Sequence, residues 1–154
     1  MKIGDALQER AAAQRKIADL RGRIAVTVTT NEDEAPIEDP NSLLAEADAV
    51  AERLGVLIRR INASNSATPF PNGGTVTEAL ARRDVLSTKL ATLEHTAKAV
   101  GGENRGYRFG RSELRTSVQV DVAALRRSIE DLAVQRRELD AAVQRISWEV
   151  DLAE

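Results

Sequence analysis

The chain has 154 residues, of which 42% are hydrophobic, 30% are charged and only 3% are aromatic, and its net charge is −2 at pH 7. This length and balance indicate one globular domain, and the scarcity of aromatic residues predicts a core of Leu, Ile, Val and Ala, as in helical bundles. The small net charge gives no overall attraction to nucleic acid or acidic membranes, and the absence of cysteine excludes disulfides, thiolate chemistry and cysteine-based metal sites.

Four stretches repeat apolar residues at alternating steps of three and four, which predicts long amphipathic helices over residues 3–28, 40–66, 76–100 and 121–150. The predicted buried face of the first consists of Ile3, Leu7, Arg10, Gln14, Ile17, Arg21, Ile24 and Val28, widened by Ala6, Ala13 and Leu20. Its content of polar residues is unusual for a buried face. Gly22 costs a helix about 1 kcal/mol relative to Ala, so we interpret it as a point of close approach to another element.

An acidic loop, residues 31–39, precedes the second helix. We interpret it as a solvated loop; the alternative is a cation site, although the spacing does not match the calcium-binding loop of EF-hands. Asp39 and Pro40 predict the N-cap and the first residue of the helix. The second helix has one apolar row at Leu43, Ala47, Val50, Leu54, Leu57 and Ile61, and a second row at Leu44, Ala51 and Ile58. Two rows indicate two neighbours.

The third helix is expected to stop at Gly101-Gly102. Residues 103–120 follow, and the alternation of apolar residues in their second half predicts a short strand or extended arm. Asp121 is the expected N-cap of the last helix. That helix has a charged residue, Arg136, within its apolar face. Trp148 is expected to anchor packing against the loop at residues 69–71.

Helices of these lengths predict an all-α fold, an antiparallel up-down-up-down four-helix bundle in a single domain over residues 1–154, with the 103–120 arm before the last helix. At about 1.5 Å of rise per residue, the polar residues of the predicted faces share one half of the bundle. These candidates are Arg10, Gln14, Asn62, Asn65, Arg83, Asp84, Arg136, Asp140 and Gln144. We interpret them as a buried ion-pair layer that fixes helix register or assembly. The alternative is a pocket for a small anion or nucleotide.

The arm carries a second set of candidate residues, four arginines around two aromatic side chains: Arg105, Tyr107, Arg108, Phe109, Arg111 and Arg115. Such a set resembles part of an RNA-binding signature and could hold phosphate or stack a base. We favour an arm whose aromatic residues dock on a neighbouring subunit and whose arginines meet the acidic loop at residues 31–39.

The pattern favours no catalytic residue, metal or cofactor. Helical metal enzymes place paired ligands three residues apart, and the only acidic pair at that spacing is Asp151 with Glu154. His95, the single histidine, has no acidic or histidine partner one turn away. With only one histidine, no Ser-His-Asp arrangement can be recognised in the sequence. No phosphate-binding glycine loop follows a strand. The first residues lack a targeting segment and no apolar run has membrane length, so a cytoplasmic protein is expected.

The chain resembles a small bacterial family of uncharacterised proteins, some of which are labelled septicolysin. The matching residues are Asp5-Ala6-Leu7 with Glu9-Arg10, Ile61-Asn62 with Asn65, Thr75 to Leu80 with Arg82-Arg83-Asp84-Val85-Leu86, and Arg137-Glu138-Leu139-Asp140 followed by Gln144 and Trp148. The resemblance covers nearly the whole chain. The label implies pore formation, but the sequence has neither a membrane-length segment nor an aromatic-rich amphipathic hairpin. Family members carry Asn before the tryptophan, where this chain has Ser147, so a role of that amide does not carry over.

The leading prediction is therefore a cytoplasmic, non-enzymatic helical bundle that forms a homo-oligomer through its helix faces and the 103–120 arm. One alternative is a small-anion or nucleotide binder, with enzymatic activity left open, that uses Arg10, Arg83, Asp84, Arg136 and Asp140. Another, less favoured, is nucleic-acid binding through the arginines at 105–115.

Overall fold

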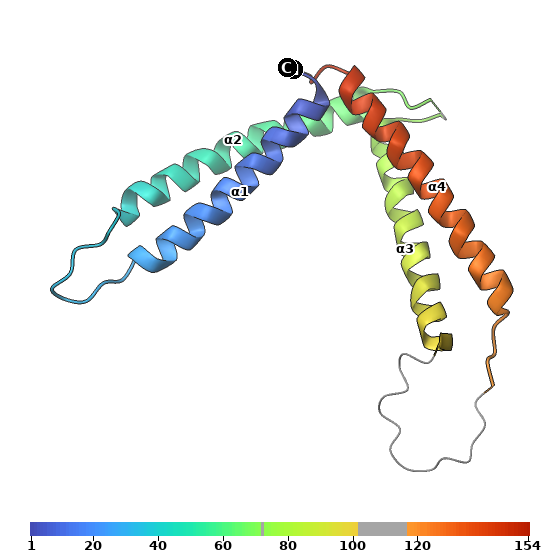
Figure 1. The fold of residues 1–154 in the computed structure, drawn as a ribbon. Helices are drawn as coiled ribbons and strands as arrows, with labels where there is room; N and C mark the ends of the chain where they lie inside the picture. Colours follow the sequence, from blue (N-terminus) through green and yellow to red (C-terminus); the bar gives the residue numbers. More distant parts are fainter. Residues whose placement is uncertain (72, 102–116) are drawn as a thin grey trace, which may run out of the picture. The chain divides into compact units, whose positions relative to one another are not determined.

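The computed structural model describes residues 1–71, 73–101 and 117–154. Figure 1 shows its four helices: α1 (Ile3–Thr27), α2 (Pro40–Ala67), α3 (Val76–Gly101) and α4 (Val122–Glu149). The prediction of an all-α fold with four long helices is confirmed, and the described residues contain isolated β-bridges but no strand. Residues 117–120, the end of the predicted arm, have no regular secondary structure. The rest of the arm, residues 103–116, lies outside the described residues.

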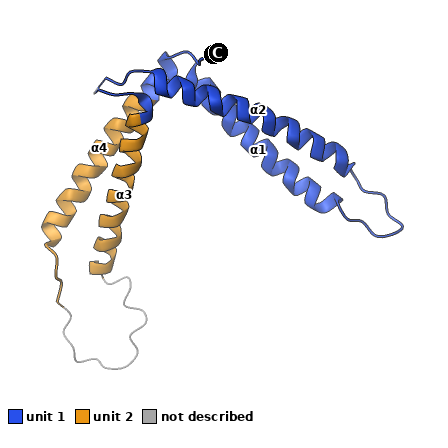
Figure 2. Ribbon diagram, turned by 180° about the vertical axis from the view of Figure 1, so that it is seen from behind, with its two compact units in different colours: residues 1–77, 144–154 blue, residues 78–143 orange. Residues whose placement is uncertain are grey.

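The chain divides into two compact units, which Figure 2 distinguishes by colour. Residues 1–77 and 144–154 form unit 1, and residues 78–143 form unit 2. Unit 1 therefore contains α1, α2 and the last turns of α4. Unit 2 contains nearly all of α3 and most of α4.

The start of α2 shows why the helix begins where it does. The carboxylate of Asp39 accepts hydrogen bonds from the backbone N–H groups of Asn41 (3.0 Å) and Ser42 (3.2 Å). Pro40 follows Asp39 as the first helical residue, where its missing N–H costs nothing. Asp121 caps α4 in the same way, through the N–H of Ala124 at 2.9 Å. The N-caps predicted at both aspartates are confirmed.

α1 and α2 lie side by side and run in opposite directions (Figure 1). Two clusters of buried side chains line unit 1. One joins Leu20 of α1 to Leu43 and Val50 of α2. The other joins Ile3 and Ala6 of α1 to Ile61 of α2 and to Leu152. The first apolar row predicted for α2 is therefore the one that packs against α1.

The buried face of α1 differs from the predicted one. Ala6 and Leu20 are completely buried, whereas Gln14, Arg21 and Val28 are exposed. The buried face is therefore rotated toward the row of Ala6, Ala13 and Leu20, which was expected only to widen it. This rotation has a physical reason, because burying Gln14 and Arg21 would remove polar groups from water without partners.

The close approach predicted at Gly22 is wrong, and the structure has one at Gly4 instead. A Cβ placed on Gly22 would meet nothing within 4 Å among the described residues. A Cβ placed on Gly4 would lie 2.6 Å from Cε3 of Trp148. Glycine at position 4 thus lets the indole ring pack on the first turn of α1.

Residues from the two ends of the sequence pair with each other in unit 1. Lys2 and Asp151 form an antiparallel β-bridge, and the backbone N–H of Ile3 donates to the carbonyl of Val150 at 3.1 Å. Leu152 is buried beside Ile3 as part of the same cluster. The hairpin of α1 and α2 is therefore completed by residues that follow α4.

In unit 2 the apolar residues that recur at steps of three and four along α3 and α4 are largely turned away from solvent. Ala79 and Leu90 of α3 and Leu125 of α4 are buried. The other apolar members of the α4 face in this unit are half-buried: Val122, Ile129, Leu132, Leu139 and Val143. Arg136 is the exception, because its side chain is 45% exposed. A long arginine stem can follow apolar surface while its guanidinium stays in water.

Candidate functional site

Four of the predicted polar residues come together in unit 2. Arg83 donates from Nε (3.2 Å) and Nη2 (3.1 Å) to Oδ1 of its neighbour Asp84. The same Nε lies 3.9 Å from Oδ1 of Asp140 on α4, and Nε of Arg136 lies 3.7 Å from the other oxygen of Asp140. Asp140 thus stands between two guanidinium groups that come from different helices.

This cluster balances its own charge, with two arginines against two carboxylates. All four side chains are at least one-third exposed, so water screens each pair and each contributes little to stability. The arrangement can hold α3 and α4 in register. Because both arginines already face carboxylates, it is not arranged as a free cationic site for an anion.

The five remaining candidates of the predicted polar layer belong to unit 1. Gln14, Asn62 and Gln144 are exposed, while Arg10 and Asn65 are half-buried. Nε of Arg10 is buried and makes no hydrogen bond to the described residues. The predicted layer is therefore shared between the two units, with a defined ion-pair cluster in unit 2 and single polar residues in unit 1.

The arm candidates, Arg105, Tyr107, Arg108, Phe109, Arg111 and Arg115, all fall in residues 102–116. They lie outside the described residues, and the structure does not test their role.

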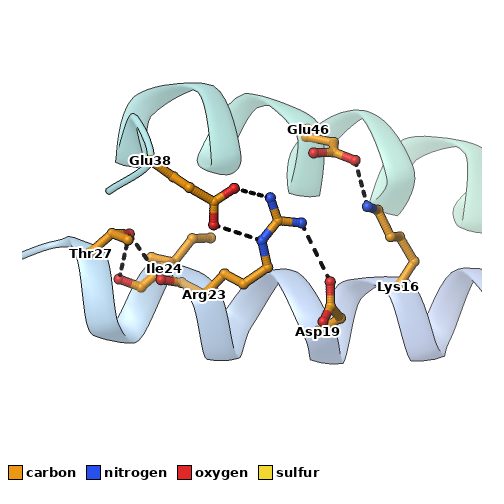
Figure 3. A network of polar contacts seen from close by, with 7 residues as sticks. All are labelled: Lys16, Asp19, Arg23, Ile24, Thr27, Glu38 and Glu46. Carbon is orange, nitrogen blue, oxygen red and sulfur yellow. Dashed lines mark hydrogen bonds and ion pairs between the residues drawn. The ribbon is translucent and has the colours of Figure 1, made fainter. Parts of the chain in front are cut away.

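A polar network at the loop end of α1 was not predicted from the sequence. Figure 3 shows Arg23 of α1 facing Glu38, just before α2, with both guanidinium edges engaged. Nε of Arg23 donates to Oε2 of Glu38 at 2.9 Å, and Nη2 donates to Oε1. Nη1 also lies 3.5 Å from Oδ2 of Asp19 one turn earlier, and Lys16 reaches Glu46 at 2.9 Å across the hairpin.

The network changes the proton affinities of its members. The hydrogen bond to Arg23 holds the pKa of Glu38 below its ordinary value, and the same bond raises the pKa of Arg23. The pKa of Asp39 is also lowered, chiefly by hydrogen bonds from Ser42 and Asn41. Ionised carboxylates thus fasten the loop between α1 and α2 to both helices. The pair of Asp19 and Arg23 could have been predicted from its i, i+4 spacing on a helix. The sequence gives no comparable indication that Glu38 is the other partner of Arg23.

A shallow groove of about 490 Å³ runs along unit 2 between α3 and α4. Leu93 of α3 and Leu132 of α4 line it, together with Thr88 and Thr92. Both threonine hydroxyls donate to carbonyls one turn earlier in α3, at 3.0 and 2.9 Å. The groove therefore presents mainly methyl and methylene groups, without a convergent set of catalytic side chains.

Neither a metal site nor a membrane span is found in the part of the chain that the structure describes. No three His, Cys, Asp or Glu side chains there converge as metal ligands. None of the described helices combines the length and the apolar character that crossing a membrane requires.

The fold and its polar contacts define an all-α protein of four long helices, held in part by ion-pair networks. The chain belongs to a family of unknown function, DUF6847, whose model matches residues 10–152. It is also similar to a solved crystal structure, that of a functionally unknown conserved protein from Corynebacterium diphtheriae. The two share 31% sequence identity over 99% of each chain, with a TM-score of 0.90. No curated protein matches the sequence.

These comparisons agree with the resemblance to an uncharacterised family. Neither description carries the label septicolysin, and the residue that departs from the family pattern has a local role. The hydroxyl of Ser147 donates to the carbonyl of Gln144 at 2.7 Å, within its own helix.

Proposed function

We propose that the chain is a non-enzymatic helical protein that assembles with further copies of itself, and that α2 provides the contact. The observation that carries this proposal is the second apolar row of α2, formed by Leu44, Ala51 and Ile58. Leu44 is 51% exposed and Ile58 is 36% exposed. The first row of the same helix is already buried on α1, so the second row is available to another chain.

The geometry of the row suits a helix from a second copy. Its members recur every seven residues, which keeps them on one face over roughly 21 Å at about 1.5 Å per residue. Ala51 at the centre, with Gly55 one turn later, lets a second helix approach closely. In a two-fold, antiparallel pair centred on Ala51, Leu44 of one copy meets Ile58 of the other. Apolar surface of this kind is favourable to bury.

Sedimentation velocity at micromolar concentration tests the proposal. We expect a mass above the 16.7 kDa of one chain, and we expect the Leu44→Glu and Ile58→Glu variants to sediment as monomers, since each places a charge in the contact. The matched control is Val56→Glu, because Val56 is 46% exposed on a different face of α2. A monomeric wild type, or equal loss of assembly in the control, would overturn the proposal.

The expected cytoplasmic location is part of the proposal and is tested by cell fractionation. The two ligand-binding alternatives have no support from the comparisons. For the polar residues of unit 2, the pairing of Arg83 and Arg136 with carboxylates favours a structural role.

A further inference from the structure

We propose that the tip of the α1–α2 hairpin receives residues 103–116 of a second copy of the chain. The tip consists of Val26, Val28 and the loop at residues 29–37. The inference rests on the proposed self-association and adds a second contact surface to it, at the far end of the hairpin from the paired chain ends.

The tip gathers the most exposed large apolar side chains of the described residues. Ile37 is 96% exposed, Val26 75% and Val28 58%. A single exposed apolar residue needs no explanation, but a group of them marks an interaction surface. The three come from both sides of one loop, so a partner that covers the loop would bury all of them.

Val26 and Ile37 border a hollow of about 460 Å³. Val26, Ala35 and Ile37 give it an apolar side, while Glu34 and the two threonines at 29 and 30 give it a polar side. A wall of this mixed kind fits a side chain that is apolar along its stem and charged at its end. Arginine has that form, and aromatic rings fit the apolar part.

The charge of the tip is negative on several counts. Glu32, Asp33 and Glu34 are exposed, and no basic residue occurs from Asn31 to Glu52. The last turn of α1, which ends here, also has no basic residue, so the negative end of its helix dipole is left uncompensated by the helix itself. Glu38 and Asp39 are engaged by Arg23 and by the start of α2, and Glu34 accepts a hydrogen bond from Nδ2 of Asn31 at 3.0 Å. The exposed carboxylates of Glu32 and Asp33 are therefore the ones that the proposed contact uses.

Residues 103–116 are the segment of this chain whose chemistry complements the tip. They contain four arginines against two glutamates, together with Tyr107, Phe109 and Leu114. Opposite charge supplies attraction and orientation, and the apolar members match the exposed valines and Ile37. In a two-fold assembly each copy would give one segment and receive one.

Charge reversal tests the contact with full-length chains. The tip variant is Glu32→Arg with Asp33→Arg, and the segment variant is Arg105→Glu with Arg108→Glu. In an assembly of either variant alone, the tip and the segment carry charges of the same sign. We therefore expect self-association at low salt to weaken by about tenfold or more. An equimolar mixture of the two variants restores opposite charges at both contacts, and we expect affinity near that of wild type. Glu94→Arg, an exposed reversal on α3, is the control and should leave association unchanged.

Sedimentation of the wild type, the variants and the mixture separates the outcomes. Restoration in the mixture supports the contact between copies. A chain that carries all four substitutions is measured as well. If this chain regains wild-type association and the mixture does not, the contact lies within one copy and the inference is overturned. Wild-type association in both variants overturns it as well, while the association through α2 stands. A monomeric wild type overturns both proposals. Circular dichroism of each variant shows whether the helices are intact.

Discussion

Trp148 packs its ring against the backbone of Gly4, so closely that the glycine cannot gain a side chain without displacing the indole. The Cβ of an alanine at position 4 would lie 2.6 Å from Cε3 and 2.7 Å from Cδ2 of the ring. Both residues belong to unit 1, where this contact joins the first turn of α1 to the end of α4.

Substitution of Gly4 tests that contact. We expect Gly4→Ala to lower the free energy of unfolding by about 1–3 kcal/mol, the usual range for an overpacked site. Urea unfolding followed by the fluorescence of Trp148, the only tryptophan, measures it. The control is Gly22→Ala, which meets open space and should raise the free energy by up to about 1 kcal/mol through helix propensity. A stabilised Gly4→Ala protein would contradict the contact.

Leu20 tests the buried face of α1. Its side chain is fully buried in the cluster with Leu43 and Val50. We therefore expect Leu20→Ala to lower the free energy of unfolding by about 2–5 kcal/mol, from lost burial and the cavity that remains. Val56→Ala, at a half-exposed position, should change it by only about 0.5 kcal/mol. Similar losses in both variants would show that α1 does not bury the Leu20 face.

Acid should loosen the loop between α1 and α2. The pKa values of Glu38 and Asp39 are held below their ordinary values of 4.5 and 3.8, so the folded state binds these protons less readily than the unfolded state. Their contribution to stability is complete above the unfolded values and is lost as pH falls through the lower folded values. Arg23 stays charged throughout this range.

Thermal unfolding between pH 7 and pH 2, followed by circular dichroism, measures this dependence. Glu38→Gln should flatten part of the acid-induced loss, since its side chain no longer titrates. The variant Glu130→Gln, an exposed position on α4, serves as the control. Parallel pH profiles of the wild type and the Glu38→Gln variant would show that Glu38 does not contribute to the acid-induced loss of stability.

The cluster in unit 2 should contribute only modestly to stability. Asp140→Asn removes the charge that faces both Arg83 and Arg136, and we expect a loss of about 1 kcal/mol or less, because exposed pairs of this kind contribute about 0–1 kcal/mol each. Urea unfolding at low and high salt measures it, and high salt should shrink the difference. A loss of several kcal/mol would instead indicate a buried charge layer.

The four helices could be predicted from the sequence because the three-and-four spacing of their apolar residues continues past the few polar residues within it, and because their caps are local. Asp39, Asp121 and Gly101 mark ends that depend only on neighbouring residues, and the observed helix limits fall within one residue of the predicted ones. The apolar rows of α2 and α4 were predictable for the same reason.

The tertiary details were not predictable in the same way. α1 has two overlapping apolar faces, and the one that is buried is decided by the packing of Leu20 against α2 together with the cost of burying Gln14 and Arg21. The Arg23–Glu38 pair joins a helix to a loop, where no period applies. The polar residues were predicted to share one layer because counting residues along each helix gives their positions along the axis of a bundle. Positions along an axis do not show that the chain divides into two units.

The pairing of Lys2 with Asp151 makes nearly the whole sequence one closed loop. During synthesis, α1 and α2 can meet as soon as residue 67 has left the ribosome, but Ile3 and Ile61 stay partly uncovered until Leu152 arrives. The entropy of closing so long a loop grows only slowly with its length, yet contacts between sequence-distant residues form late. The hairpin is therefore expected to pass through a stage at which one end of its core is exposed. Chaperones that bind apolar surface would bind the chain at this stage.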